Sequence, residues 1–391
     1  MANRFNNRVF GAVLVKATVA NYNADFTGSP RTLPNGVVYA TDKALKYAIR
    51  NYLKQNNTIF YTTRYKKENM QPLDIDETYI ELFGEYPKLV KVEENKEVKA
   101  IKKDPEKKKE AFIKQIEEEV DKFINENNGY KIVSSINNNY LLNKEIDSKN
   151  NFVIIGQKPD DIKRVPILQN LFKSLDIRLF GATFASKEGN ISIHGNAQIT
   201  HGINIYAQNN IFTEDIVSPF RNSNDKSDDS QQTTIGNQTV LEEGHYLHNF
   251  TINPKNSEEL IKLIDNQGYL TIDDISKFKE AINRGVSYLD SASKIGVENE
   301  FSIFVTLNKN KKIQLPSFTT LIKVEEQEES FKRKLDLSEI KNLLEDVADK
   351  VEKVEIYIDA TKLDYDDEIF DISNVCVKSI ISDKELKKCQ K

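Results

Sequence analysis

Four basic side chains recur every three or four residues in the segment TDKALKYAIRNYLK, residues 41–54: Lys43, Lys46, Arg50 and Lys54. Thr41 or Asp42 can supply an N-cap, so the segment is predicted to be a helix. Its apolar residues share the other side of that helix: Leu45, Ala48, Ile49, Tyr52 and Leu53. Lysine and arginine at this spacing can each meet a successive phosphate of one strand, and arginine can add bidentate geometry. The pattern therefore favours binding of a polyanion.

Positive charge is concentrated around this helix. Residues 31–67 contain eight Lys or Arg and one acid, whereas the whole chain has a net charge of -5. A basic row on a helix can also be a solvated face. Here a long loop with Gly and Pro precedes the helix at residues 21–36, and an aromatic, basic strand is expected at residues 58–66. These flanks favour a local groove for nucleic acid, since a pI near 5.7 argues against indiscriminate coating of DNA.

The length and composition of the chain limit the classes of protein to which it can belong. A chain of 391 residues, 39% of them hydrophobic and 29% charged, predicts two or three globular domains. No apolar run is long enough to span a bilayer, and the N-terminus lacks the apolar region of a signal peptide, so we expect a cytoplasmic protein with no membrane partner. Cys376 and Cys389 give neither a disulfide framework nor a zinc spacing, and no cofactor is expected.

The remaining pattern predicts strands separated by insertions. Residues 8–20 alternate as a strand with one decidedly apolar face, residues 68–128 form a charged helical lobe, and residues 125–151 form a loop around one short strand. Further strands are expected at 191–206, 245–253, 317–324 and 354–358, and a helix that turns into a strand at 176–185. Further helices are expected after Asp160, after Asn256 (with Glu259 at N3), after Thr271 (with Asp274 completing a capping box) and at 336–351. Residues 222–238 are expected to form an exposed polar tip. Strand, helix and strand near both ends predict an α+β fold with a ferredoxin-like or RRM-like sheet.

The order of several segments resembles a known family. The segments are RVFGAVLVKATVANYNADFTGSPRT, TDKALKYAIRNYL, DIRLFGATFA, ISIHGNAQITHG, IGNQTVLEEGHYLHNF and AINRGVSYLDSASKIGVENEF. Together they resemble the Cas-seven family, the RNA-binding backbone subunits of type I CRISPR interference complexes (Cascade), from residue 8 to about residue 307 apart from the helical insertion. The stretches NADFTG and ATDKALKY are most similar to subtype I-B.

The resemblance implies an RRM-like palm, an inserted helical fingers lobe and a protruding thumb hairpin. The palm would comprise residues 1–67, 160–204 and 246–391, the fingers residues 68–159, and the thumb residues 205–245. Such subunits polymerise along the CRISPR RNA beside other subunits of the complex, and each thumb folds over the guide. Sequence reading of the target DNA is left to base pairing with the guide. The resemblance thus implies a protein that is not an enzyme.

By position, the resemblance also implies which residues hold RNA. Lys46 and Arg50 match residues that hold guide phosphates, with Thr41 and Lys43 beside them. Further RNA-binding residues would be Asn21, Asn23, Arg31 and Arg178. The thumb tip would be residues 231–239, with Gln231, Thr234, Ile235, Gly236 and Thr239. The chain departs from the family at Tyr47, where some members have another basic residue, and in the loop before the helix, which is often richer in Gly and Arg.

Other activities compete with this interpretation. Backbone subunits of type III complexes resemble this fold and cut target RNA with an Asp in the loop after the first strand, where this chain has Asp25. The non-catalytic alternative is that Asp25 stabilises its loop through local hydrogen bonds. A monomeric RRM-like binder of single-stranded RNA would stack bases on Tyr61 and Tyr65.

The histidines and a cluster of acids are further candidates for a metal site. The four histidines are His194, His201, His245 and His248. His245 and His248 are three residues apart on an expected strand, which places their side chains on opposite faces, so metal binding is not favoured. Asp364, Asp366, Asp367 and Glu368 lack the spacing of a calcium loop and are expected to form a solvated turn.

Overall fold

The computed structural model describes residues 3–221, 232–264, 268–328, 330–366, 372 and 374–387. The chain divides into two compact units. Unit 1 comprises residues 1–56, 197–254 and 270–391, and unit 2 comprises residues 57–196 and 255–269. Each unit therefore gathers segments that are far apart in the sequence, and the mixture of helices and sheets agrees with the predicted α+β class. Within the described residues, no helix is long and apolar enough to cross a membrane.

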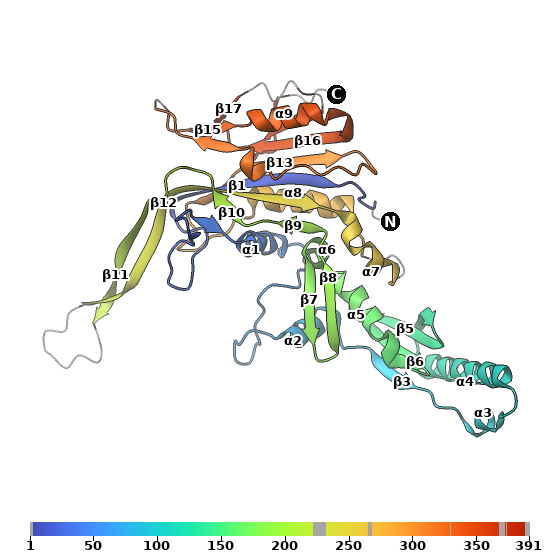
Figure 1. The fold of residues 1–391 in the computed structure, drawn as a ribbon. Coiled ribbons are helices and arrows are strands. Elements are labelled where there is room, and N and C mark those ends of the chain that lie inside the picture. The colour runs from blue at the N-terminus through green and yellow to red at the C-terminus, as the bar shows by residue number, and fades with distance from the viewer. Residues whose placement is uncertain are drawn as a thin grey trace. The chain divides into compact units, whose positions relative to one another are not determined.

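Unit 1 is built on a large sheet in which strands from both ends of the chain lie side by side (Figure 1). Its main path runs β19-β18-β16-β13-β1-β12-β10-β2, and β9 and β11 pair with β12. The bounds are β1 Val9–Ala20, β2 Tyr39–Ala40, β9 Ala197–Ile199, β10 Gly202–Asn204, β11 Ile211–Arg221, β12 Gln232–Ile252, β13 Val297–Leu307, β16 Val351–Ile358, β18 Val375–Ser379 and β19 Glu385–Lys387. β1 is antiparallel to both of its neighbours, with Leu14 opposite Leu247 of β12 and opposite Phe301 of β13.

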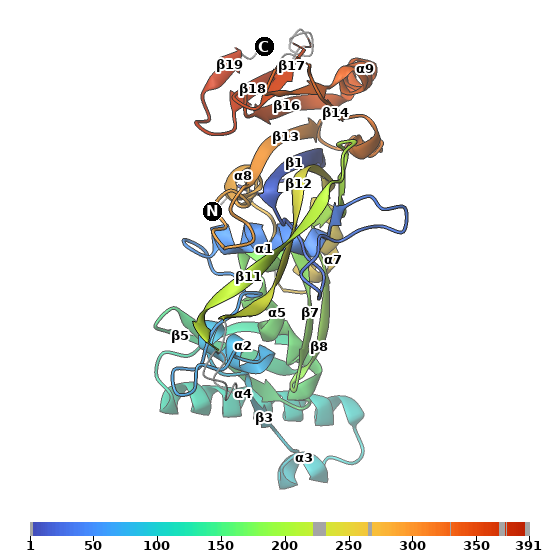
Figure 2. The same ribbon diagram turned by 90° about the vertical axis from the view of Figure 1, so that its left-hand side faces the viewer.

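Both faces of β1 are buried, so the prediction of a single apolar face was wrong. Phe10, Ala12 and Leu14 belong to a core cluster that includes Ile340 and Leu344. Those two residues lie on helix α9, Ser338–Asp346, which lies beside β16 in Figure 2, while the 3-10 turn Phe318–Thr320 of the same cluster contacts β1. A strand that is covered on both sides carries apolar residues on both sides. The alternation of residue size along β1 does not reveal this.

The other face of the sheet is covered by helix α8, Ile272–Arg284, which packs on helix α1, Asp42–Leu53. Phe278 of α8 meets Phe250 of β12 with the ring centroids 5.6 Å apart. Gly11 of β1 makes room for this contact, since a Cβ there would lie 2.3 Å from the Phe250 ring. The predicted capping box of α8 is confirmed: the Thr271 side chain accepts from the backbone N–H of Asp274, and the Asp274 carboxylate accepts from that of Thr271.

Unit 2 contains most of the charged segment and two small sheets. A four-stranded sheet has the order β3-β6-β5-β4, and β7 pairs with β8. The bounds are α2 Ile75–Phe83, β3 Lys88–Lys91, α3 Lys96–Ala100, α4 Pro105–Glu126, β4 Lys131–Ile136, β5 Asn139–Ile146, β6 Lys149–Gly156, α5 Arg164–Leu171, α6 Leu175–Phe180, β7 Gly181–Ser186, β8 Gly189–His194 and α7 Glu258–Lys262. Helix α4 buries Phe112, Ile116 and Val120, which is the helical spacing expected from the sequence.

The Asn-rich stretch at residues 125–151 is not a loop around one strand. It lies mainly in the hairpins β4-β5 and β5-β6. The two connecting turns have positive φ at both central residues, namely Asn137 and Asn138 in the first and Asp147 and Ser148 in the second. Short polar residues tolerate this left-handed conformation, which matches the twist of a hairpin. The same composition therefore marks turns rather than the absence of structure.

The strand predicted at residues 58–66 does not form either. The Asp176 carboxylate accepts hydrogen bonds from the backbone N–H of Phe60 (2.8 Å) and of Tyr61 (3.0 Å). The Arg64 guanidinium donates to the carbonyl oxygens of Phe60 and Ile59. These side chains occupy the backbone groups that a neighbouring strand would otherwise have used.

Several predicted boundaries also differ from the structure. The strand expected at 191–206 is divided into β8, β9 and β10, and the helix expected after Asn256 is the short α7, which has no side-chain N-cap bond. Asp160 lies in a 3-10 turn, Pro159–Ile162, before α5. Residues 317–324 hold a 3-10 turn, Phe318–Thr320, and the start of β14, Lys323–Glu325. The helix expected at 336–351 ends at Asp346, while β16 confirms the strand at 354–358.

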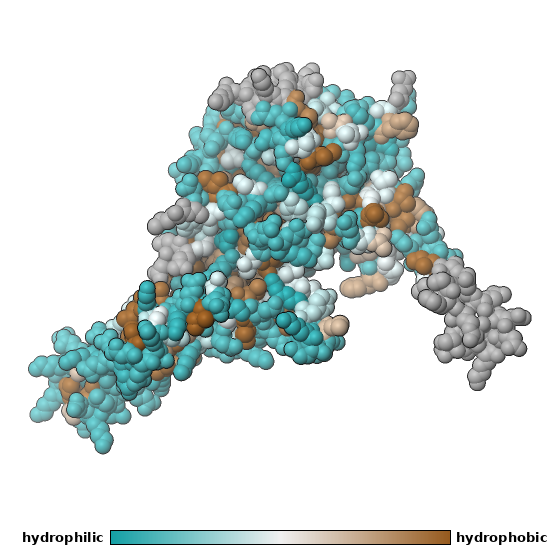
Figure 3. Space-filling model, turned by 180° about the vertical axis from the view of Figure 1, so that it is seen from behind, coloured by the Kyte–Doolittle hydropathy of each residue, from teal (hydrophilic) through white to brown (hydrophobic). Residues whose placement is uncertain are grey.

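The C-terminal part adds a second small sheet to unit 1, in the order β14-β15-β17, with β15 at Arg333–Asp336 and β17 at Leu363–Tyr365. In the acidic cluster, Asp364 pairs with Lys332 and Asp366 with Lys334, whereas Asp367 and Glu368 lie outside the described residues. Cys376 of β18 is disulfide-bonded, although no disulfide framework was predicted; Cys389 lies outside the described residues. The face of the molecule in Figure 3 is mostly hydrophilic, with apolar side chains in small separate patches.

Candidate nucleic-acid interface

Helix α1 forms as predicted and presents basic residues beside a buried apolar stripe. Thr41 is the N-cap, and its hydroxyl accepts from the backbone N–H of Ala44 (3.3 Å). The buried residues are Leu45, Ala48, Ile49 and Leu53. Lys43 is exposed, whereas Lys46 and Arg50 are half-buried. The amphipathic pattern thus turns three of the predicted phosphate-binding residues away from the core, but not all to the same extent.

Lys46 is held by the acid of its own helix. Its Nζ lies 2.9 Å from Oδ2 of Asp42, one turn earlier, and 16% of its side chain is exposed. Burial raises the pKa of Asp42, but the hydrogen bond and charge of Lys46 outweigh burial and hold that pKa below its usual value. A phosphate that meets Lys46 must therefore compete with the Asp42 carboxylate.

Asn23 ties the preceding loop to the start of α1. Its Oδ1 accepts from the backbone N–H of Thr41 (2.9 Å) and from the Thr41 hydroxyl (3.0 Å). Asn21 is buried, and its Nδ2 donates to the carbonyl oxygens of Gly28 (3.0 Å) and Thr239 (3.2 Å). The geometry gives both asparagines a positioning role, in which they fix the loop at residues 21–31 against α1 and β12.

Arg31 closes the base of the same loop. Its Nε donates to the carbonyl oxygen of Ala24 (3.0 Å), and its backbone N–H donates to that of Asn23. No hydrogen bond within the described residues uses its two Nη groups. Arg31 is thus held at Nε while the outer edge of the guanidinium keeps the donors that a phosphate can accept.

Asp25 acts as a brace for this loop. Its Oδ1 accepts from the backbone N–H of Thr27 (2.8 Å), the Thr27 hydroxyl (2.7 Å) and the backbone N–H of Ser29 (3.2 Å). The Thr27 hydroxyl lowers the pKa of Asp25 most, followed by the Thr27 backbone bond. This is the local pattern by which an Asp side chain stabilises a turn.

His201 lies beside the start of α1, a position that the sequence pattern did not predict. β10 pairs with β2 and places Gly202 opposite Ala40, so His201 lies at the start of α1. Its Nδ1 accepts from the backbone N–H of Asp42 (3.2 Å), and its ring lies 5.7 Å from the Tyr39 ring. More than half of its side chain is exposed. Only the pairing of two short strands brings these residues together, so no local sequence signal could have found them.

Arg178 lies in unit 2, on α6, and serves that unit. Its Nη1 donates to the carbonyl oxygens of Phe172 (2.8 Å) and Lys173 (2.9 Å), which follow α5. Its own carbonyl oxygen accepts from Nδ2 of Asn196. These bonds occupy one edge of the guanidinium within unit 2.

The hairpin of β11 and β12 contains the predicted thumb-tip residues. β12 begins at Gln232, so residues 234–239 lie in a paired strand rather than in the connection: Gly236 is opposite Ile216 and Thr239 opposite Thr213. Thr234 is opposite Val217, and Ile235 lies between Thr234 and Gly236 in β12. Gln231 falls outside the described residues. β11 also exposes three apolar side chains that the sequence analysis did not single out: Ile211, Phe212 and Ile216.

The two central histidines serve separate polar clusters in the core. His245 Nδ1 lies 2.7 Å from Glu300 and its Nε2 3.0 Å from Glu243. His248 donates from Nδ1 to the carbonyl oxygen of Thr200 (2.9 Å), so its Nε2 accepts from the Tyr22 hydroxyl (3.2 Å). Among the described residues, no group of three or more potential ligands could hold a metal ion.

Comparison with known proteins gives one family. A model of the family described as CRISPR-associated protein Cas7 matches residues 7–358. No curated protein shows a significant match. A chain of a solved "CRISPR RNA-guided surveillance complex" has a TM-score of 0.45 at 10% identity, covering 94% of each chain, and one of a "CRISPR RNA-guided surveillance complex, pre-nicking" has a TM-score of 0.47 at 10% identity, covering 96% of this chain and 97% of that one.

Proposed function

Because the chain belongs to the CRISPR-associated protein Cas7 family, we propose that it is a non-catalytic subunit that binds CRISPR RNA and polymerises along it as the backbone of a type I interference complex. Its partners are the guide, further copies of itself, other subunits of the complex, and target DNA through the guide. The similarity of residues 23–28 and 40–47 to subtype I-B members makes that subtype part of the proposal.

The observation that carries the proposal is the joint between loop and basic helix. Asn23 binds both donors of Thr41, so the loop with Arg31 is joined to the start of the basic helix. Preorganised donors bind a strand of phosphates without an ordering cost. Contacts to the phosphate backbone bind RNA regardless of its sequence. They suit a subunit that leaves recognition of the target sequence to base pairing with the guide.

The order of the central strands supports an RRM-like palm. The chain runs β1, α1, β10, β12, α8 and β13, and these strands lie in the order β13-β1-β12-β10 with antiparallel neighbours. This is the split β-α-β-β-α-β arrangement. The β11-β12 hairpin, which projects from this sheet, is the proposed thumb, and the segment with α2 to α4 is the proposed fingers lobe.

The test is the salt dependence and footprint of RNA binding by the purified full chain. The double substitution Lys46→Ala with Arg50→Ala is expected to weaken binding to every RNA sequence alike and to reduce the salt slope by about 0.7 for each phosphate that the variant no longer neutralises. The matched control is Lys109→Ala with Lys114→Ala, which removes two exposed charges from α4. Nuclease protection is expected to repeat along the RNA at a regular interval.

Three results would contradict the proposal. If the salt slope of the double variant were unchanged, or if the control reduced it equally, Lys46 and Arg50 would not belong to the interface. A single footprint would indicate a monomeric binder. Regular cleavage of a guide-complementary RNA that Asp25→Ala abolishes would show that the subunit is catalytic.

A further inference from the structure

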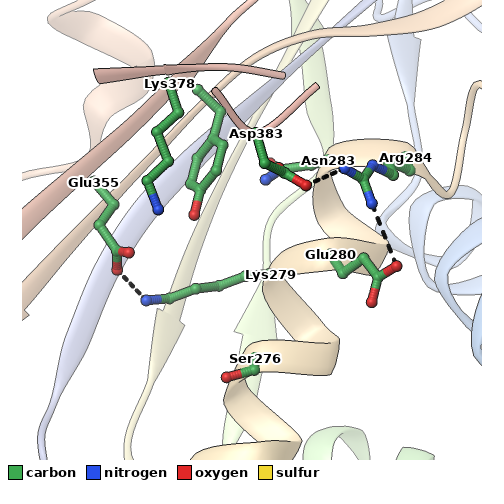
Figure 4. A pocket seen from close by; sticks show the side chains of 9 residues that line it. Ser276, Lys279, Glu280, Asn283, Arg284, Glu355, Lys378 and Asp383 are labelled. Atoms are coloured by element: carbon green, nitrogen blue, oxygen red, sulfur yellow. Dashed lines mark hydrogen bonds and ion pairs between the residues drawn. The ribbon is translucent and has the colours of Figure 1, made fainter. Parts of the chain in front are cut away.

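Unit 1 contains a polar pocket of about 500 Å³ away from the loop at residues 21–31. Helix α8 forms one wall, and β16, β18 and the turn before β19 form the others (Figure 4). Its lining residues are Ser276, Lys279, Glu280, Asn283, Arg284, Glu355, Tyr357, Lys378 and Asp383. The volume lies within the range of pockets that hold small ligands or single side chains.

The acidic side chains of this pocket already have cationic partners. Glu355 is bound by Lys279 and by Lys353, the latter with Nζ 2.9 Å from Oε1. Burial raises the pKa of Glu355, but the charge of Lys279 and its hydrogen bond outweigh burial and keep that pKa below its usual value. Arg284 binds both Asp383 and Glu280. All three acids are therefore paired with cations.

Three donors in the same pocket have no acceptor among the described residues. The Tyr357 hydroxyl, Nδ2 of Asn283 and Nζ of Lys378 make no hydrogen bond or ion pair within that part of the chain. Tyr357 is 6% exposed and Asn283 is 4% exposed, and the donor atoms of both remain accessible from the pocket. Burial raises the pKa of Tyr357, which keeps its hydroxyl protonated. Donors that line one pocket and have no acceptor in the described part of the chain can together bind a ligand that accepts from them.

Lys378 carries the charge that selects the ligand. Its Nζ lies 5.6 Å from the centroid of the Tyr357 ring, and its side chain extends into the pocket from β18, where the acids pair with Lys279 and Arg284 (Figure 4). The lining has three cations and three anions, and Lys353 adds a further cation behind Glu355. Lys378 is thus the lining cation that has no ion pair among the described residues, and its charge matches a single negative charge.

We propose that this pocket binds one carboxylate group, held by Lys378, Tyr357 and Asn283. A carboxylate has two oxygens with about four lone-pair sites, enough to accept from all three donors. A strand of phosphates fits less well, because the lining carboxylates repel its further charges. The carboxylate belongs to a small free acid or to a Glu or Asp side chain of a protein, and both sources share this chemistry.

The experiment titrates the purified full chain with named probes by ligand-observed NMR. The probes are acetate, the peptide acetyl-Gly-Glu-Gly-amide, its Gln counterpart, and a short single-stranded RNA. Lys378→Met is expected to weaken acetate and Glu-peptide binding at least tenfold, and Tyr357→Phe, which keeps the ring, by about three- to tenfold. The matched control is Lys384→Met, which removes an exposed lysine outside the pocket lining.

The probes separate the sources and can overturn the proposal. If the Glu peptide binds at least tenfold more tightly than acetate, the ligand is a protein side chain; equal affinities indicate a free acid. The Gln peptide is expected not to bind. The proposal fails if neither pocket variant changes carboxylate binding, if Lys384→Met changes it equally, or if the RNA displaces acetate. RNA binding at α1 is expected to be the same in all three variants, so this result is independent of the proposed function.

Discussion

The side chain of Asn23 accepts hydrogen bonds from both the backbone N–H and the hydroxyl of Thr41, so one amide oxygen joins the loop after β1 to the N-cap of α1. The N-cap is where a helix has donors that its own turns cannot satisfy. Thr41 uses its oxygen for Ala44, and Asn23 satisfies Thr41 in turn. The same two hydrogen bonds therefore fix both the position of the loop and the start of the basic helix.

Asn23→Ala is expected to lower the free energy of unfolding by about 1–2 kcal/mol, because it leaves a half-buried backbone N–H without a partner. RNA affinity should fall as well, since Arg31 and α1 lose their fixed relation. Urea unfolding and RNA binding of the same preparations measure the two effects. The control is Asn35→Ala, which removes an exposed local bond to the Val37 N–H. Equal behaviour of the two variants would contradict the role given to Asn23.

Asp42→Asn is expected to strengthen RNA binding. The substitution releases Lys46 from its ion pair and removes a negative charge from the interface, while Thr41 remains as the N-cap. Ion pairs between residues one turn apart on a helix are worth a few tenths to about 1 kcal/mol, which corresponds to an increase in affinity of about two- to fivefold. Filter binding at low and moderate salt would measure it.

The control for this prediction has the same geometry on another helix. Asp273 lies in the first turn of α8 and pairs with Lys277 one turn later, at 2.7 Å. Asp273→Asn should leave RNA affinity unchanged. Weaker binding by Asp42→Asn, or an equal gain in Asp273→Asn, would show that Lys46 does not meet phosphate.

The elements that could be predicted from the sequence are those whose signals are local. The α1 stripe and N-cap, the α8 capping box and the alternation of β16 depend on residues within one or two turns. The strand expected at residues 58–66 failed because Asp176, more than a hundred residues away, binds its backbone. His201 could not be placed at α1 because only the pairing of β10 with β2 brings it there. Contacts between residues that are far apart in the chain produce no periodic pattern in the sequence.

Gly11→Ala is expected to destabilise unit 1 strongly. A Cβ at this position would lie 2.3 Å from both the Ile303 carbonyl oxygen and the Phe250 ring, so the central strands or α8 must shift. Overpacking of this kind costs about 1–3 kcal/mol. Gly236→Ala is the control, because a Cβ there meets nothing within 4 Å. Thermal unfolding should separate the two variants, and a small effect of Gly11→Ala would mean that α8 packs less tightly than described.

The stability of the chain should fall in mild acid because of His248. Burial lowers the pKa of His248 to about 4, from 6.5 in a solvated chain. Between these values the unfolded state binds a proton that the folded state refuses, so the free energy of unfolding decreases as the pH falls from 6.5 towards 4. The full shift is worth about 3 kcal/mol. Urea unfolding at a series of pH values would measure it.

His245 acts in the opposite sense and must be separated from His248. Burial lowers the pKa of His245, but Glu243 and Glu300 outweigh burial and raise it, so its contribution is present below 6.5 and is lost as the pH rises through the raised value. The comparison of the chain with His248→Gln isolates the first effect, since His245 is common to both. The variant should be less stable at pH 7, because Tyr22 and Thr200 lose their partner, and should lose less stability than the parent between pH 6.5 and 4. Parallel pH profiles for the two proteins would show that His248 does not titrate in this way.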